Sequence, residues 1–180
     1  TNTSSLSVTA IGARCRLPAR IAGLHFFNPV PLMKVVEVVR AMRTDEAAVE
    51  RLVALVRATG HRPVVTRDTP GFIVNHAGRA YGTEALAVLG EGVADVEAID
   101  RILREQVSFD GNGFRLGPFE LLDLTALDVS QPVMESIYRQ FYDEPRFRPS
   151  VLGAQRLAAG LLGREQRRFL PLRRRRRARR

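Results

Sequence analysis

The stretch GLHFFNPVPLMKVVEVV, residues 23–39, is almost wholly apolar and constrains the fold more than any other part of the chain. Its flanks, IAGLHFF and KVVEVVR, are rich in β-branched and aromatic residues and predict two buried strands. NPVPLM predicts a Pro-rich connection between them. Besides Lys34, three polar side chains interrupt the stretch, namely His25, Asn28 and Glu37. Buried polar groups need hydrogen-bond partners, so these residues either satisfy one another or face a ligand.

The spacing predicts that His25 and Glu37 oppose each other. If the two strands fold back about Pro31, opposed residues have numbers that sum to 62, which pairs these two. Directly opposed side chains in an antiparallel pair lie ~5 Å apart at Cβ, close enough for a carboxylate–imidazole hydrogen bond. A register slip of one residue would undo the pairing. From the residues alone, a buried structural pair and a catalytic pair both remain open.

The residues around this stretch complete an α/β layer. TNTSSLSVTAIG predicts a strand that leaves a polar turn, and RPVVT predicts a further short strand. TDEAAVERLVALVRATG predicts an amphipathic helix that Thr44 caps and Gly60 ends. Strand, strand, helix and strand in this order are typical of the end of an α/β domain. We therefore assign residues 1–68 to the C-terminal part of such a domain.

Beyond residue 68 the pattern is helical throughout, which predicts an all-α domain over residues 69–163. The expected helices are GFIVNHAGRAYGTEALAVL, VEAIDRILREQ, FELLDLTAL, VMESIYRQFYD and a short segment that ends at Gly160. The residues expected to start them are Thr69 with Pro70, Asp95, Pro118, Ser130 with Pro132, and Ser150.

The net charge of +9 is confined to the end of the chain. Residues 164–180 hold ten Arg and one Glu, which leaves 18 basic and 18 acidic residues over residues 1–163. A neutral body disfavours nucleic-acid binding. The Arg side chains of the tail repel one another and bury nothing, so we predict that the tail is disordered or the product of a shifted reading frame.

Other classes of protein are disfavoured by the sequence. Cys15 is the single cysteine, so no intrachain disulfide can form, and His25, His61 and His76 lack metal-ligand spacing. No run of eighteen apolar residues and no signal segment is present, which favours a cytoplasmic protein without membrane contact. GNGFRLG does not match a dinucleotide-binding motif, because its third Gly is one position late and we expect no strand before it.

Four motifs in order, NTSSL, GLHFFNPVPLMKVVEVV, DTPGFIVN and GPFELLDL, resemble the NAD-dependent L-3-hydroxyacyl-CoA dehydrogenases. The resemblance runs from Asn2 to about Arg164, and its C-terminal half is most similar to 3-hydroxybutyryl-CoA and 3-hydroxyadipyl-CoA dehydrogenases. It implies NAD-dependent oxidation of an L-3-hydroxyacyl-CoA to the 3-oxoacyl-CoA. It also implies the end of a Rossmann domain followed by an all-α domain that forms a homodimer.

The resemblance implies catalytic and substrate-binding roles. His25 would be the general base that takes the proton of the substrate's 3-hydroxyl group while hydride leaves C3 for NAD, and Glu37 would orient it. Ser4 would hydrogen-bond the reacting oxygen, and Asn75 would hold the acyl-CoA substrate. For Ser4 a purely local role in a turn stays open.

The cofactor side of the resemblance is less complete. Asn28 would lie near the nicotinamide, with Asn2 assisting, although Asn28 could instead only shape the connection before Pro29. The Gly-rich turn that holds the NAD pyrophosphate in this family has no counterpart in the sequence. We therefore expect an N-terminally truncated chain that is inactive by itself. The alternative is a non-catalytic helical dimerisation module.

Overall fold

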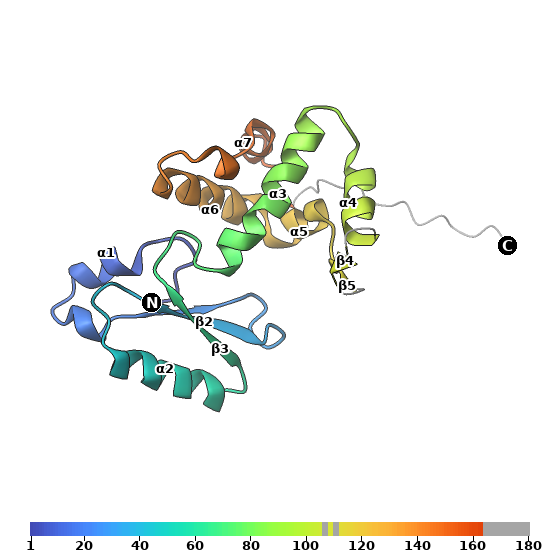
Figure 1. Cartoon of the computed structure of the whole chain (residues 1–180). Helices are drawn as coiled ribbons and strands as arrows, with labels where there is room; N and C mark the ends of the chain where they lie inside the picture. The colour runs from blue at the N-terminus through green and yellow to red at the C-terminus, as the bar shows by residue number, and fades with distance from the viewer. Residues whose placement is uncertain (106–107, 110–111, 164–180) are drawn as a thin grey trace. The chain divides into compact units, whose positions relative to one another are not determined.

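The computed structural model describes residues 1–105, 108–109 and 112–163, and the predicted tail, residues 164–180, lies outside these (Figure 1). The chain divides into two compact units. Unit 1 comprises Thr1–Gly78 together with Arg139–Tyr142, and unit 2 comprises Arg79–Tyr138 and the chain from Asp143 onward. The domain boundary near residue 68 stays a prediction.

Unit 1 contains a three-stranded sheet with the order β1-β2-β3. β1 (Gly23–Phe26) pairs antiparallel with β2 (Val35–Arg40), and β2 pairs parallel with β3 (Arg62–Arg67). Within the first pair His25 opposes Glu37, so the predicted register is confirmed. As expected for a central strand covered on both faces, β2 is buried along almost its whole length.

Helices cover both faces of this sheet. α2 (Glu46–Ala58) lies along one face (Figure 1), where Val36 and Val38 pack against Val49 and Val56. On the other face Val39 packs against Val8 of α1 (Val8–Ala13) and Phe72, and a short 3₁₀ turn, η1 (Pro18–Arg20), follows α1. Because side chains alternate along β2, Glu37 points to the same face as Val39.

Two predictions about this unit are wrong. TNTSSLSVTAIG was expected to form a strand, yet its second half is α1. The helix forms because Ser7 Oγ accepts a hydrogen bond from Ala10 N, and because the distant Asp68 carboxylate accepts from Val8 N and Thr9 N. The N-cap of α2 is Asp45 rather than Thr44, whose hydroxyl instead donates to the Ile21 carbonyl.

Unit 2 is helical, and in Figure 1 its other helices gather about α3 (Val74–Gly90), which begins in unit 1. The further elements are α4 (Val96–Glu105), β4 (Ser108–Phe109), β5 (Asn112–Gly113), α5 (Pro118–Thr125), α6 (Leu127–Gln140), η2 (Pro145–Phe147) and α7 (Val151–Ala158). The core includes Ala85, Leu86, Ile99, Phe119, Leu122, Leu127 and Met134. The prediction of an α/β part followed by helices is confirmed.

Three of the predicted helix starts are confirmed and two are wrong. Asp95 and Ser150 accept hydrogen bonds from amides of the first turns of α4 and α7, and Pro118 opens α5. α3 begins at Val74 rather than at Thr69, after the positive-φ residues Gly71 and Phe72. α6 begins at Leu127, so the predicted starting residue Pro132 lies inside it.

Candidate active site

A buried imidazole–carboxylate pair forms the centre of the candidate site. His25 at the carboxyl end of β1 is 3% exposed, and Glu37 on β2 is 0% exposed. His25 Nδ1 lies 2.7 Å from Glu37 Oε2. The other carboxylate oxygen, Oε1, accepts hydrogen bonds from Ile73 N at 2.9 Å and Val74 N at 3.0 Å. Both oxygens of Glu37 are therefore satisfied, as a buried carboxylate requires.

These contacts decide the charge of Glu37. Burial by itself raises the pKa of the carboxyl group, but the hydrogen bonds from His25, Val74 and Ile73 outweigh burial and hold the pKa below its ordinary value of 4.5. Glu37 is therefore an anion at neutral pH. An anion facing Nδ1 favours a proton on that nitrogen, which leaves Nε2 free to accept a proton when the ring is neutral.

Ser4 lies at this second nitrogen. Its Oγ is 3.1 Å from His25 Nε2, within hydrogen-bonding distance. The rings of Phe27 and Phe72 flank the imidazole, with centroids 4.5 Å and 5.6 Å away. Carboxylate, imidazole and hydroxyl thus form a line from the interior of unit 1 outward, and its geometry suits proton transfer at Nε2.

The other predicted site residues occupy different positions. Asn75, in the first turn of α3, donates from Nδ2 to the Ser4 carbonyl at 3.3 Å, so it joins the group around His25. Asn2 Oδ1 accepts from Phe26 N at 2.9 Å, which ties the start of the chain to β1. Asn28 follows β1 and is exposed. The structure brings Ser4, His25, Glu37 and Asn75 together, with Asn2 and Asn28 near the end of β1.

Some residues of this region carried no functional signal in the sequence. Asp68 and Gln140 both bind the segment around Ser4, through Val8 N and the Ser5 carbonyl respectively. Asp68 lies within DTPGFIVN. An Asp before a Thr-Pro pair is typical of a turn, so it did not indicate a functional role. Gln140 lies in a helical pattern far from the other motifs, and no local signal could have identified it.

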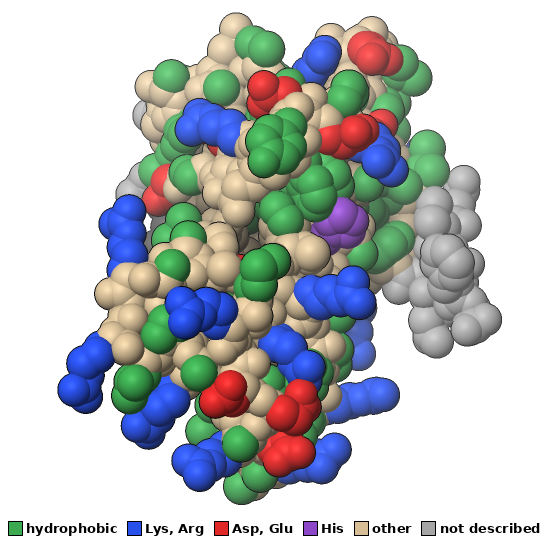
Figure 2. All heavy atoms as spheres, turned by 60° about the vertical axis from the view of Figure 1, so that its left-hand side comes forward, with side chains coloured by type: hydrophobic (Ala, Val, Ile, Leu, Met, Phe, Trp, Pro, Cys, Tyr) green, Lys and Arg blue, Asp and Glu red, His purple; other side chains and the backbone are tan. Residues whose placement is uncertain are grey.

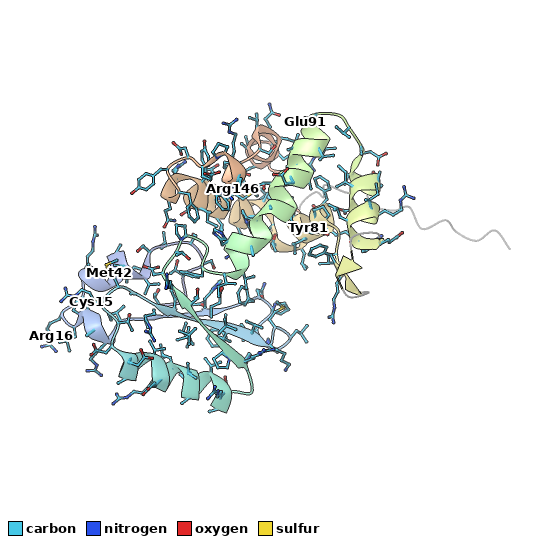
Figure 3. The ribbon with its side chains drawn as sticks, in the orientation of Figure 1. Cys15, Arg16, Met42, Tyr81, Glu91 and Arg146 are labelled. Carbon is cyan, nitrogen blue, oxygen red and sulfur yellow. The ribbon has the colours of Figure 1, made fainter. Side chains whose placement is uncertain are left out.

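Polar features elsewhere are separate from this group. Cys15 lies just after α1, and Tyr81 lies on α3 (Figure 3). The hydroxyl group of Tyr81 donates a hydrogen bond to the Leu116 carbonyl, and burial raises the pKa of Tyr81 to about 12. A hollow of about 390 Å³ in unit 1 contains none of the site residues. It is lined by Ala19, Arg20, Asp45, Ala47, Ala48, Arg51 and Leu52.

The described residues include no cluster of three or more His, Cys, Asp or Glu side chains placed to bind a metal. None of the helices among them is both long enough and apolar enough to cross a membrane. On the face shown in Figure 2, Lys and Arg side chains are spread over the surface, with acidic side chains beside several of them.

Family models match nearly the whole chain. The model of the 3-hydroxyacyl-CoA dehydrogenase NAD binding domain matches residues 1–69, and that of the C-terminal domain matches residues 71–170, which is more than half of the chain. The chain belongs to the 3-hydroxyacyl-CoA dehydrogenase family. The resemblance seen in the four motifs is thereby confirmed.

Relatives within the 3-hydroxyacyl-CoA dehydrogenase family support the assignment. The 3-hydroxyadipyl-CoA dehydrogenase of Escherichia coli is 47% identical over 92% of this chain and 34% of its own length. The human mitochondrial hydroxyacyl-coenzyme A dehydrogenase is 41% identical over 83% of this chain and 46% of its own. The chain thus spans a third to about half of the length of these relatives.

Solved structures of the family share the fold. The crystal structure of an E. coli 3-hydroxybutyryl-CoA dehydrogenase superposes with a TM-score of 0.83 at 48% identity, covering 91% of this chain and 34% of that one. The (S)-3-hydroxybutyryl-CoA dehydrogenase of Ralstonia eutropha gives 0.84 at 38% identity, covering 91% and 56%. The fold class of this family member is therefore the one predicted.

Proposed function

We propose that this chain carries the proton-transfer site of an NAD-dependent L-3-hydroxyacyl-CoA dehydrogenase, which oxidises the 3-hydroxyl group of an acyl-CoA to a ketone. The observation that carries the proposal is the line Glu37–His25–Ser4, with its 2.7 Å and 3.1 Å contacts. Family membership supplies the reaction class, because the relatives include a 3-hydroxyadipyl-CoA dehydrogenase and a hydroxyacyl-coenzyme A dehydrogenase.

In the proposed reaction, His25 Nε2 removes the proton of the substrate's 3-hydroxyl group. The electrons of that O–H bond form the C=O bond, while the hydrogen on C3 leaves with its electron pair. NAD, when bound, accepts that hydride. Glu37 holds the ring in the tautomer with an open Nε2 and stabilises the imidazolium that forms.

Ser4 and Asn75 are proposed to bind the substrate. The Ser4 hydroxyl can hydrogen-bond the same oxygen that His25 deprotonates, because it already lies 3.1 Å from Nε2. Asn75 donates to the Ser4 carbonyl through Nδ2, which leaves its Oδ1 as an acceptor for the acyl-CoA substrate. These two residues would therefore orient the substrate, while the base itself lies on the sheet.

Asn2 and Asn28 fit the nicotinamide end of NAD. The Oδ1 of Asn2 is taken by Phe26 N, so its Nδ2 remains as a donor close to the end of β1. Asn28 is exposed after the same strand and offers both a donor and an acceptor, which a carboxamide group needs. The pyrophosphate of NAD would need a Gly-rich turn as well, and GNGFRLG does not match one because its third Gly is one position late.

A homodimer through unit 2 is also proposed. Leu121 and Leu124 are three residues apart on α5, and Val129 follows on α6. All three are exposed although large and apolar. An exposed apolar face of this kind is typical of an interaction surface, and it also supports the second candidate function, a helical dimerisation module without catalysis.

The test uses a hybrid in which this chain replaces the matching segment of the E. coli 3-hydroxyadipyl-CoA dehydrogenase. We expect the hybrid to form NADH from an L-3-hydroxyacyl-CoA, and we expect the 180-residue chain alone to form none, because hydride transfer needs NAD held against C3. A hybrid that is folded and binds NAD but makes no NADH contradicts the proposal and favours the dimerisation module.

A further inference from the structure

The segment that carries Ser4 has no regular secondary structure, so side chains must hold it in place. Residues 1–7 precede α1, and Ser4 lies in a bend. Thr3 Oγ1 accepts hydrogen bonds from Ser5 N at 3.3 Å and Leu6 N at 2.8 Å, which folds the segment on itself. In a segment without regular backbone hydrogen bonds, such side-chain contacts set the free energy of local opening. The position of the Ser4 hydroxyl therefore depends on its anchors.

Asp68 anchors the far end of this segment. Its Oδ2 accepts from Ser7 Oγ at 2.9 Å and from Thr9 N at 2.6 Å, and its Oδ1 accepts from Val8 N at 2.9 Å. Three hydrogen bonds to one carboxylate fix the junction between the segment and α1. Between this junction and Ser4 only Ser5 and Leu6 remain.

Gln140 holds that remaining part. Its Nε2 donates to the Ser5 carbonyl at 2.6 Å, although the two residues are 135 positions apart. Residues 139–142 belong to the same compact unit as Ser5. The ring centroid of Phe141, the next residue, lies 5.3 Å from the ring centroid of His76. A side chain at the end of α6 thus binds the backbone one residue from Ser4.

The backbone after Gln140 is conformationally costly. Tyr142 has φ 53° and Asp143 has φ 62°, which places two consecutive non-glycine residues in the left-handed region. Each such residue costs on the order of 1 kcal/mol or more and persists where contacts over-determine it. The contacts of Gln140 and Phe141, immediately before these residues, are of this kind. The end of α6 is therefore held in a specific place rather than fraying.

We propose that Gln140 is a positioning residue for Ser4. Its amide fixes the Ser5 carbonyl, and through it the direction from which the Ser4 hydroxyl meets His25 Nε2. The Gln140 amide binds the backbone beside Ser4, so its effect on the imidazole is indirect and passes through Ser4. The catalytic meaning of this role rests on the proposed function, whereas the positioning itself can be measured without turnover.

The test records the ring-nitrogen NMR signals of His25 in the ¹⁵N-labelled 180-residue chain. Gln140→Met removes the donor but keeps an unbranched side chain of similar length, and Gln140→Lys retains an N–H donor. Gln155→Met makes the matched change at an exposed position on α7. Ser4→Ala supplies the Nε2 signal of a ring that has lost its serine partner.

We expect Gln140→Met to move the Nε2 signal towards its position in Ser4→Ala. We also expect it to speed amide exchange of Ser5 and Leu6 about tenfold, the effect of losing one hydrogen bond of ordinary strength. Gln140→Lys should restore both observables, and Gln155→Met should leave both unchanged.

An Nε2 signal that stays at its wild-type position in Gln140→Met overturns the proposal. Loss of the folded spectrum in that variant also overturns it, because Gln140 would then support the fold in general. An inactive hybrid enzyme would contradict the proposed function but would leave these signals unaffected, so the two failures can be told apart.

Discussion

His25 and Glu37 are polar residues in the most apolar part of the chain, and each makes the other's burial possible. Removing one partner of such a pair leaves the other buried without its hydrogen bond, at a cost of roughly 1–3 kcal/mol. The Ile73 and Val74 amides add a further constraint, because they need an acceptor at Glu37 Oε1. The pair is therefore both a structural element and a device that sets the tautomer of His25.

Glu37→Gln should impair the proposed base through its tautomer. The amide of Gln can donate to Nδ1, which would place the ring proton on Nε2, where the proton must be accepted. We expect kcat of the hybrid to fall roughly 10²–10⁴-fold. The double variant with His25→Gln should be little worse than His25→Gln alone, because the two residues act as a unit. Steady-state kinetics check this, and additive losses would contradict it.

The lowered pKa of Glu37 predicts how this pair responds to acid. Because the folded pKa lies below the ordinary value of 4.5, the unfolded state binds protons more readily as the pH falls. The stabilisation is present above about pH 4.5 and is lost as the pH falls through the folded pKa. The melting temperatures of wild type and Glu37→Gln should therefore differ most above pH 4.5 and converge as the pH falls below it. A difference that is constant over this range contradicts the prediction.

Packing between α4 and α5 in unit 2 depends on Asp100, a buried carboxylate that accepts backbone hydrogen bonds as Glu37 does in unit 1. Asp100 of α4 is buried and accepts hydrogen bonds from Phe119 N and Glu120 N, so it caps α5 from a neighbouring helix. Burial raises the pKa of Asp100 in spite of these two hydrogen bonds. The approach is so close that a Cβ at Gly117 would overlap Asp100 Cγ. Gly117 is needed here for space rather than for its φ of −66°.

Gly117→Ala should therefore destabilise the chain by about 1–3 kcal/mol, the usual cost of overpacking. Gly78→Ala is the matched control, because a Cβ there meets nothing within 4 Å and lies inside α3. In a helix interior that change should stabilise by about 0.5–1 kcal/mol. Denaturant unfolding of the two variants measures the change in the free energy of unfolding at each position, including its sign. Equal effects at the two positions would contradict the packing argument.

Local patterns predicted the sheet and most helices, because those elements are decided by periodicity and nearby caps. The register of β1 and β2 followed from the alternation around a Pro-rich connection, so the His25–Glu37 contact was predictable. α1 was missed because its capping carboxylate, Asp68, is 60 positions away from Val8. The start of α3 was misplaced because Glu37, far earlier in the sequence, takes the amide of Val74.

At the scale of the whole molecule, the relatives are two to three times longer than the segment that they share with this chain.

The proposed homodimer gives a test that does not depend on enzymatic activity. Leu124 of α5 is 49% exposed and Leu55 of α2 is 51% exposed, so the two form a matched pair. We expect Leu124→Glu to weaken self-association in analytical ultracentrifugation, while Leu55→Glu leaves it unchanged. Equal sedimentation of all three chains at every concentration contradicts the proposed interface.

The most direct test of the central claim is the rate of NADH formation by His25→Gln in the hybrid, measured in a single turnover with saturating NAD and L-3-hydroxyacyl-CoA. If His25 is the general base, the rate should fall roughly 10²–10⁴-fold. NAD affinity should stay unchanged, because the imidazole contacts Glu37 and Ser4 rather than the proposed nicotinamide residues. A His25→Gln hybrid that turns over near the wild-type rate would show that the proton leaves by another route.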